Sequence, residues 1–161
     1  MKNSISIVVI GLFTLFLVFG FTNNETTKVK CMVQMVNYSG EGAYIITSLI
    51  NPKGEYEKTL YVQGEDPEWY SDIKEWWKFY NTKQQDIDAI TGETIAGGER
   101  SIFLLEIPTN KIDAGYSVRF ETSVEDKDYH VKDIQFELTS QNIKGKIEGT
   151  GFIRYVRMIS Q

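Results

Sequence analysis

The sequence has very few of the residues from which disulfide frameworks and metal centres are built. Its 161 residues include one cysteine and one histidine. A single cysteine excludes an intramolecular disulfide and a Cys-rich metal site, and a single histidine excludes a multi-histidine metal centre. The sequence also contains no G-x-S-x-G elbow, P-loop, HExxH motif or EF-hand loop. These absences weigh against hydrolytic and nucleotide-driven chemistry, so we expect a protein that is not an enzyme.

Positive charge is also scarce. The chain has 17 Lys and Arg against 22 Asp and Glu, which gives a formal net charge of -5. This balance does not suit a surface that neutralises nucleic-acid phosphates or anionic lipids. Hydrophobic residues make up 42% of the chain and charged residues 24%, as in a globular domain. We therefore expect one folded domain that does not bind nucleic acid.

The one long apolar run lies at the N-terminus. Residues 1–20 contain a cation at Lys2 and an apolar run from Ile5 to Phe19. A run of about 15 apolar residues is short for a membrane-spanning helix, which needs roughly 20, so a cleaved signal peptide is favoured over an uncleaved anchor. We expect a signal peptide at residues 1–20, a single β-sandwich domain at residues 21–161, and an extracytoplasmic location, periplasmic or secreted.

The rest of the chain has mostly a hydrophobic period of two. Residues 116–124 show it best, and they predict a strand with an apolar face at even positions and a solvated face at odd positions. Further strands are predicted at residues 28–36, 44–50, 55–62, 101–107, 133–138 and 152–159. Short strands without alternating helices favour an all-β, immunoglobulin-like antiparallel β-sandwich. Cys31 lies on the apolar side of its strand and is expected to be a buried hydrophobe.

One stretch departs from this period. An apolar stripe at spacings of four, three and four runs through residues 66–80 and consists of Trp69, Ile73, Trp76 and Tyr80. This spacing predicts a short amphipathic helix over residues 71–80, with Ser71 as N-cap and the stripe packed as core over an edge or end of the sandwich. Trp77 lies off the stripe, so it is the candidate for an exposed ring that stacks on a planar ligand such as a flavin or a sugar.

A polar segment of residues 81–101 follows, and its centre, residues 88–94, reads DAITGET. Gly92 stands between hydroxyl residues and predicts a tight turn with positive φ, in which Asp88 forms an Asx turn and Thr91 and Thr94 are presented to solvent. Successive amides in such a turn can bind an anion. The alternative is an ordered surface turn without a ligand.

The order of these segments resembles the family of predicted periplasmic proteins called domain of unknown function 2271. The likeness covers roughly residues 28–140 and rests on WYSDIKEWW at 69–77, DAITGET at 88–94, Gly98 before a strand, and DAGY at 113–116 leading into VRFE. The resemblance implies a bacterial extracytoplasmic protein associated with flavin-transferase systems. Some members are labelled flagellin biosynthesis protein, which implies a likeness to the immunoglobulin-like domain of flagellar hook-capping proteins. The Trp-Asp-Gly feature of that domain is missing here from residues 104–107.

Residues 88–94 are also similar to the D-x-x-[ST]-G-A-T signature at which a flavin transferase esterifies FMN phosphate to the last threonine. Asp88, Thr91 and Gly92 match the signature, and Thr94 takes the place of the acceptor. Glu93 stands where the signature has alanine, and its carboxylate repels an incoming diphosphate-linked flavin.

The sequence leaves three functions open. The first is a secreted, non-enzymatic accessory or binding domain linked to an extracytoplasmic flavin-dependent redox system, with a protein partner such as a flavin transferase. The second is a covalent FMN-carrying electron-transfer protein with the flavin on Thr94 and Trp77 beside the ring. The third is a structural or assembly module that docks partners through a sheet edge.

Overall fold

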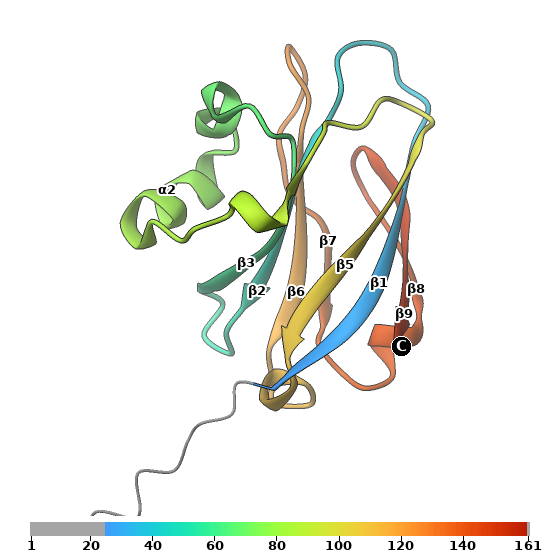
Figure 1. Ribbon diagram of the computed structural model, residues 1–161. Helices are drawn as coiled ribbons and strands as arrows, with labels where there is room; N and C mark the ends of the chain where they lie inside the picture. Colours follow the sequence, from blue (N-terminus) through green and yellow to red (C-terminus); the bar gives the residue numbers. More distant parts are fainter. Residues whose placement is uncertain (1–24, 161) are drawn as a thin grey trace, which may run out of the picture.

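Two β-sheets pack face to face in the computed structural model, which describes residues 25–160 (Figure 1). The strands are β1 (Thr26–Met35), β2 (Tyr44–Ile50), β3 (Tyr56–Gln63), β4 (Thr91–Gly92), β5 (Arg100–Pro108), β6 (Ser117–Ser123), β7 (His130–Glu137), β8 (Lys146–Glu148) and β9 (Ile153–Ser160). One sheet has the order β5-β1-β9-β8 and the other β4-β3-β2-β6-β7. All neighbouring strands are antiparallel except β3 and β4. The expected all-β sandwich is confirmed.

Every segment that the period of two predicted overlaps a strand, because alternation is a local property of the chain. The two strands that the sequence did not predict are β4, with two residues, and β8, with three. Neither is long enough to show a period. Residues 1–24 and 161 are outside the described part of the chain, and the expected signal peptide lies among them. Within residues 25–160, none of the helices has both the length and the apolar character needed to span a membrane.

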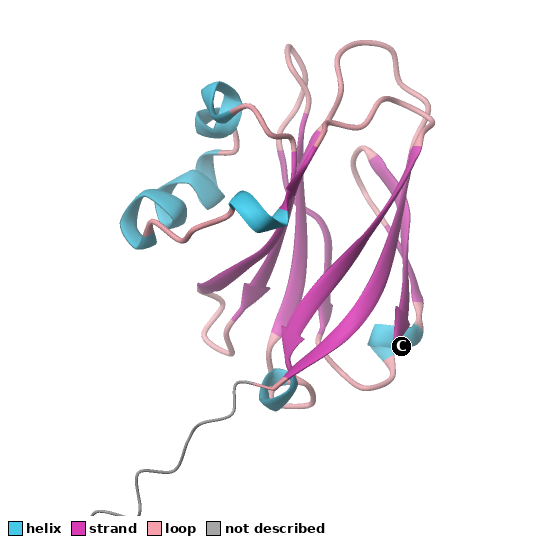
Figure 2. Ribbon diagram, viewed as in Figure 1, coloured by secondary structure: helices cyan, strands magenta, loops and turns pink. Residues whose placement is uncertain are grey.

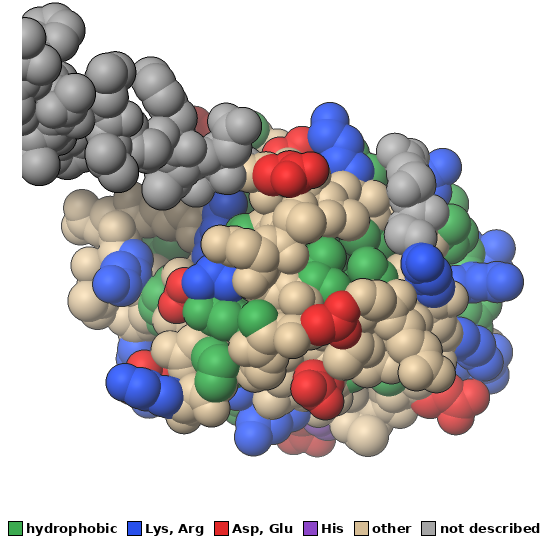
Figure 3. Space-filling model, turned by 90° about the horizontal axis from the view of Figure 1, so that it is seen from below, with side chains coloured by type: hydrophobic (Ala, Val, Ile, Leu, Met, Phe, Trp, Pro, Cys, Tyr) green, Lys and Arg blue, Asp and Glu red, His purple; other side chains and the backbone are tan. Residues whose placement is uncertain are grey.

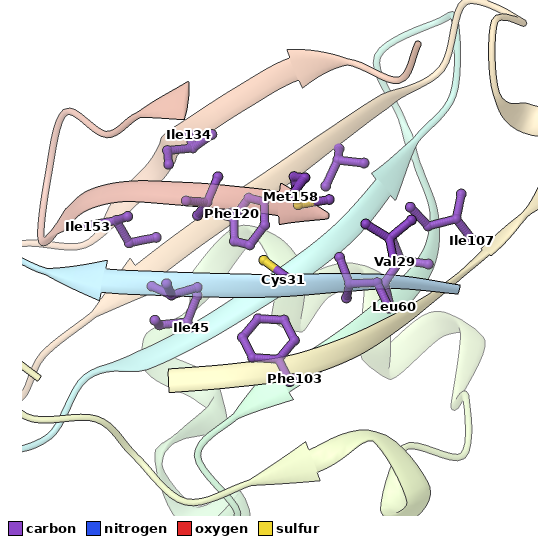
Figure 4. Packing of buried hydrophobic residues seen from close by; sticks show 14 of the residues in the cluster. Val29, Cys31, Ile45, Leu60, Phe103, Ile107, Phe120, Ile134, Ile153 and Met158 are labelled. Carbon is purple, nitrogen blue, oxygen red and sulfur yellow. The ribbon is translucent and has the colours of Figure 1, made fainter. Parts of the chain in front are cut away.

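The core between the sheets is apolar. Cys31 is fully buried there, and Figure 4 shows its sulfur beside the Phe120 ring, with Phe103 and Met158 on the strands next to β1. Burial raises the pKa of the Cys31 thiol well above its usual range, because the thiolate would lose its hydration. The expected burial of Cys31 is therefore confirmed.

A layer of helices covers the outer face of the five-stranded sheet (Figure 2). It consists of η2 (Pro67–Asp72), α2 (Lys74–Lys83) and η3 (Asp88–Ile90), while η4 (Thr109–Lys111) and η5 (Asn142–Lys144) lie elsewhere. A second apolar cluster fills the space between this layer and the sheet, with Ile46 and Val62 from the strands and Ile73 and Trp76 from the helical layer. Trp76 is fully buried, and its Nε1 donates to Thr59 Oγ1 at 3.0 Å.

The helix does not begin where the sequence predicted. Asp66 caps η2, since its Oδ1 accepts from the backbone N of Glu68 at 3.0 Å. The chain leaves helical geometry at Ile73 (φ -89°, ψ 66°), and α2 begins at Lys74 without a side-chain cap. The expected N-cap at Ser71 and the expected start at residue 71 are therefore wrong.

The odd-numbered face of β6 is also different from the prediction. It was expected to be solvated, but Arg119 is 6% exposed and Glu121 is fully buried. Tyr56 and Tyr129 cover these side chains, and the helical layer lies over the same face of the sheet. Alternating polar residues indicate a solvent-exposed face of a strand only when no other segment of the chain covers that face.

The free edge of β3 is closed by segments that follow α2. The Gln85 side-chain amide pairs with the backbone of Thr59, accepting from its N and donating to its O, both at 2.9 Å. Farther along the same edge, β4 pairs with Val62 and Gln63. Because unpaired strand edges are prone to aggregation, this cover protects the sheet. It also fixes the position of residues 88–94.

Candidate functional site

Residues 88–94, the segment with the flavinylation-like signature, do not form a tight turn. They form η3, then the short strand β4 beside β3, and Ile95 then bridges Ala43 with two backbone hydrogen bonds at 2.7 and 3.2 Å. The segment is therefore held at both ends by backbone pairing, and Thr94 lies just before the second pairing.

Two predicted roles within this segment are wrong. Gly92 does not have the positive φ expected of it. A glycine stands there because a Cβ atom would lie 2.4 Å from the hydroxyl oxygen of Tyr61. The Asx turn is formed by Asp86, whose Oδ1 accepts from the backbone N of Asp88 at 3.1 Å, while the Asp88 side chain is exposed.

The two threonines of the segment differ in their surroundings. Thr91 is half-buried, and its Oγ1 donates toward the carbonyls of Ile87 and Asp88 at 3.3 and 3.1 Å. Thr94 is exposed, and no described residue hydrogen-bonds to its hydroxyl. Its Oγ1 faces Gly42, where a Cβ atom would be only 2.4 Å away. Of the two hydroxyl groups, that of Thr94 is the one open to chemistry.

Thr94 lines a pocket of about 160 Å³ at the end of the five-stranded sheet where β2 begins and β6 ends. This end lies uppermost in Figure 1, beside η2. We call it the η2 pocket. It is lined by Glu41, Gly42, Tyr44, Trp69, Asp72, Thr94, Ser123 and Glu125.

The walls of the η2 pocket are acidic and aromatic. Glu41, Asp72 and Glu125 line it, and no Lys or Arg is among the lining residues. Trp69 is 36% exposed, and Tyr44 is half-buried with its hydroxyl donating to the carbonyl of Asp66 at 3.3 Å. Burial raises the pKa of Tyr44, and the negative charges of Asp66, Glu65 and Glu68 raise it further. The negative potential of this end therefore extends to the carboxylates around η2.

Ser123 is the one nearly buried polar side chain among the lining residues. It is 8% exposed and lies opposite Tyr44 in the β2–β6 pair. Its hydroxyl makes no hydrogen bond to any described residue, whereas the neighbouring Thr122 Oγ1 donates to Asp133 at 2.7 Å. Among the described residues, the enclosed hydroxyl groups without a partner belong to Thr47 and Ser48. The Ser123 hydroxyl is instead reachable from the pocket, so it can bond to water or to a ligand there.

Trp77, which the sequence favoured as an exposed stacking residue, does not line the η2 pocket. It is half-buried and packs against the second apolar cluster, between the helical layer and the sheet, with its ring stacked on Tyr80 at 5.7 Å between centroids. The exposed tryptophan is Trp69, which lies in η2 and outside α2. The sequence pattern placed Trp69 on the buried stripe because the helical spacing of α2 was extended back to residue 69, across the break at Ile73. It gave no signal for Tyr44 or Ser123, which come from strands far apart in the chain.

A buried carboxyl lies two residues from Ser123 along the same face of β6. Glu121 accepts a hydrogen bond from the Tyr56 hydroxyl at 2.6 Å and another from the Tyr129 hydroxyl. Burial raises the pKa of Glu121 to about 7, although both tyrosines and the nearby Arg119 favour its ionised form. The Tyr129 hydroxyl also accepts from the backbone N of Glu75, which ties α2 to the sheet.

A second depression lies on the other side of the signature segment. It is a groove of about 610 Å³ between β3, η3 and β5, and its charged lining residues are Lys58, Asp86 and Glu106. Ala89 and Ile90 border this groove, whereas Thr94 borders the η2 pocket. The two ends of the signature segment therefore face different depressions.

The η2 pocket does not fit an FMN ring. Its volume is well below the roughly 300 Å³ at which pockets for drug-sized ligands begin, and its carboxylates repel a phosphate. A flavin joined to Thr94 would extend outside the pocket. Across residues 25–160, no grouping of three His, Cys, Asp or Glu side chains is arranged to hold a metal ion.

Comparison with known proteins identifies the family. A family model described as a predicted periplasmic protein, DUF2271, matches residues 26–155. No curated protein and no solved structure matches the chain. The matched family is the one that the sequence segments resemble, and its description agrees with the expected extracytoplasmic location. The chain therefore belongs to the DUF2271 family of predicted periplasmic proteins.

Proposed function

We propose that this protein is a non-enzymatic binding domain of the periplasm and that the η2 pocket is its binding site. The observation that supports this most directly is Ser123, a nearly buried residue whose hydroxyl bonds to no described residue and is open to the pocket. A bound polar group would complete its hydrogen bonding.

The side chains of the η2 pocket favour binding over catalysis. Its aliphatic hydroxyl groups belong to Thr94 and Ser123, and no His, Lys or Cys lines the pocket to activate them as nucleophiles. The one histidine, His130, packs edge-on against Phe152 at 5.0 Å between ring centroids. The lining residues offer hydrogen-bond acceptors, negative charge and aromatic faces, which are the means of recognising a ligand.

The link to an extracytoplasmic flavin-dependent redox system comes from the family resemblance. In this proposal the domain is an accessory subunit, and its protein partner is a flavin transferase or a flavin carrier of that system.

The binding function can be tested by NMR. A panel of small cationic, neutral and anionic compounds is titrated into the ¹⁵N-labelled protein, and amide shifts are followed. We expect at least one class to shift the amides of Gly42, Thr94 and Ser123 in a saturable manner. Substitution of Ser123 by alanine should weaken that response, while the exposed Asp128→Asn should not change it. A panel that moves none of these amides contradicts the proposal.

A second function, that of a covalent FMN carrier, is supported by the exposed and unpaired hydroxyl of Thr94. Intact-mass measurement after co-expression with the cognate flavin transferase should then show one FMN adduct. The adduct should be lost in Thr94→Ala and kept in Thr91→Ala, because the Thr91 hydroxyl is engaged with backbone carbonyls. Glu93→Ala should raise the yield by removing a like charge. No adduct under conditions where a known carrier is modified would show that this function is wrong.

A further inference from the structure

We propose that the η2 pocket recognises the ammonium group of a small aliphatic primary amine. This assignment rests on the proposed binding function and names its ligand class.

Charge is the first reason for this assignment. Glu41, Asp72 and Glu125 approach the pocket from the β1–β2 connection, the end of η2 and the segment after β6. Three carboxylates that border one small pocket give it a negative potential, which attracts a cation. Figure 3 shows Lys and Arg side chains around the rim of the opposite end of the molecule. At the pocket itself, no Lys or Arg is among the lining residues.

The aromatic walls are the second reason. Trp69 offers a partly exposed indole, and Tyr44 forms another wall with its ring edge-on to Tyr70 at 6.2 Å. Cations bind favourably to the faces of aromatic rings, most strongly to tryptophan. The same walls give the alkyl body of an amine an apolar surface to contact.

Ser123 distinguishes a primary ammonium from other cations. A primary ammonium has three N–H donors, whereas a quaternary ammonium has none. The unpaired Ser123 hydroxyl can accept one of these hydrogen bonds and the wall carboxylates can accept the others. A quaternary cation would leave Ser123 unpaired and would gain only the charge and aromatic contacts.

Size and spacing favour an organic cation over a metal ion. A cavity of about 160 Å³ corresponds to roughly five water molecules in the liquid, which is enough for a short alkyl amine. No group of three acidic side chains within residues 25–160 is placed to hold a metal ion. A primary ammonium needs only two carboxylates as acceptors beside Ser123, so it suits this arrangement better than a metal ion.

The assignment can be tested with n-butylammonium as the probe. A ligand of five heavy atoms is expected to bind with a Kd of about 1 mM, so titration of amide shifts in the ¹⁵N-labelled protein is the suitable measurement. Butyltrimethylammonium, n-butanol, butyrate and calcium chloride serve as comparison compounds. We expect saturable shifts at Gly42, Thr94 and Ser123 with butylammonium, weaker binding of the quaternary cation, and no saturable response to butanol or butyrate.

Variants identify the groups that bind the probe. Asp72→Asn and Glu125→Gln should each lower the affinity for butylammonium by about tenfold, since each removes one charged hydrogen-bond acceptor. Trp69→Leu should lower the affinity for both cations, because it removes the aromatic ring while it keeps an apolar side chain. Ser123→Ala should lower the affinity for butylammonium and leave the affinity for butyltrimethylammonium unchanged. Glu106→Gln, an exposed change on β5, is the matched control and should have no effect. Unchanged shifts in the two sheets confirm that each variant is folded.

The outcomes separate this inference from the proposed function. Equal binding of the two cations, stronger pocket binding of butanol or butyrate, or binding of calcium alone would overturn the primary-amine assignment while the pocket stays a binding site. A protein in which none of these compounds moves the pocket amides contradicts both.

Discussion

The backbone of Gly92 lies against the side chain of Tyr61. A Cβ atom at Gly92 would be 2.4 Å from the Tyr61 hydroxyl oxygen and 3.5 Å from Cζ. The ring of Tyr61 has little room to move, since it stacks on Phe103 at 3.9 Å between centroids with an interplanar angle of 5°. Close approach of a neighbouring side chain, and not left-handed backbone geometry, therefore explains the glycine in the signature segment.

Gly92→Ala is expected to lower the free energy of unfolding by about 1–3 kcal/mol, because the added methyl overpacks the contact with Tyr61. Tyr61→Phe removes the oxygen that the methyl would strike, so the double variant should recover most of this loss. Urea denaturation of the two single variants and the double variant measures the coupling.

Gly54→Ala is the matched control. Gly54 has a φ of +85° and no atom within 4 Å of an added Cβ, so alanine there is unfavourable for backbone reasons alone. Tyr61→Phe should not rescue it. If the effects of Gly92→Ala and Tyr61→Phe simply add, the close-approach explanation is wrong.

The buried Glu121 makes stability depend on pH. Burial raises its pKa from 4.5 to about 7, so between these values the native state holds a proton that the unfolded chain releases. Stability falls with rising pH where the native state binds more protons. The free energy of unfolding should therefore include a contribution from Glu121 that is most favourable below pH 4.5 and is lost as the pH rises to about 7.

Glu121→Gln should flatten the dependence of stability on pH between about 4.5 and 7, because glutamine does not titrate. The amide oxygen can still accept from Tyr56 or Tyr129, which limits the structural change. The measurement is the urea midpoint at a series of pH values for the wild type, Glu121→Gln and the exposed control Glu106→Gln. A variant whose pH profile has the same slope as the wild type between pH 4.5 and 7 would show that Glu121 is ionised throughout.

Glu121 also shows how far the sequence predicts this fold. The strands follow from alternating polarity, which a short window reveals. The same alternation made the Arg119 and Glu121 side of β6 look solvated. Its burial depends on residues 66–90 folding back over the sheet, and the polar groups are tolerated there because Gln135 binds Arg119 and two tyrosines bind Glu121. Pairing of this kind joins distant segments and leaves no local pattern.

The candidate site shows the same limit. The exposure of Thr94 was predicted correctly from its polar segment. Trp69 was misplaced because the interruption at Ile73 is a backbone feature that hydrophobic spacing does not reveal. Ser123 lies on the face of β6 that was expected to be solvated, and local alternation does not reveal that it borders a pocket beside η2.

Two fully buried threonines allow a direct comparison of paired and unpaired hydroxyl groups. Thr47 Oγ1 has no hydrogen-bond partner among the described residues, whereas Thr59 Oγ1 accepts from Trp76 Nε1 at 3.0 Å. Thr47→Val should stabilise the protein by about 1 kcal/mol, because it removes an unpaired buried polar group at nearly constant volume. Thr59→Val should destabilise it by about 1–2 kcal/mol, because it leaves the indole N–H unpaired. Urea denaturation monitored by circular dichroism measures both, and changes of the same sign would contradict this account.

The carboxylate of Asp133 on β7 holds the turn that leads into β9. It is 1% exposed, and its two oxygens accept from four donors. Oδ1 accepts from the backbone N of Thr150 at 3.0 Å and of Gly151 at 2.8 Å, and Oδ2 accepts from Ile153 N at 2.9 Å and Thr122 Oγ1 at 2.7 Å. Asp133 therefore connects strands of both sheets at one end of the sandwich, since β7 belongs to the five-stranded sheet and β9 to the other.

Asp133→Asn is expected to lower the free energy of unfolding by about 3 kcal/mol. The amide has only one acceptor oxygen, so its NH₂ group would face donors where the second carboxylate oxygen had accepted, and two hydrogen bonds to a charged group would be lost. Asp128→Asn is the matched control, because Asp128 is exposed in the β6–β7 connection and should tolerate the change within about 0.5 kcal/mol. Hydrogen exchange adds a local readout: the amides of Gly151 and Ile153 should lose protection in Asp133→Asn, while those of β2 keep theirs at matched stability. Equal midpoints for the two variants, or unchanged protection of the turn, would show that the carboxylate does not anchor it.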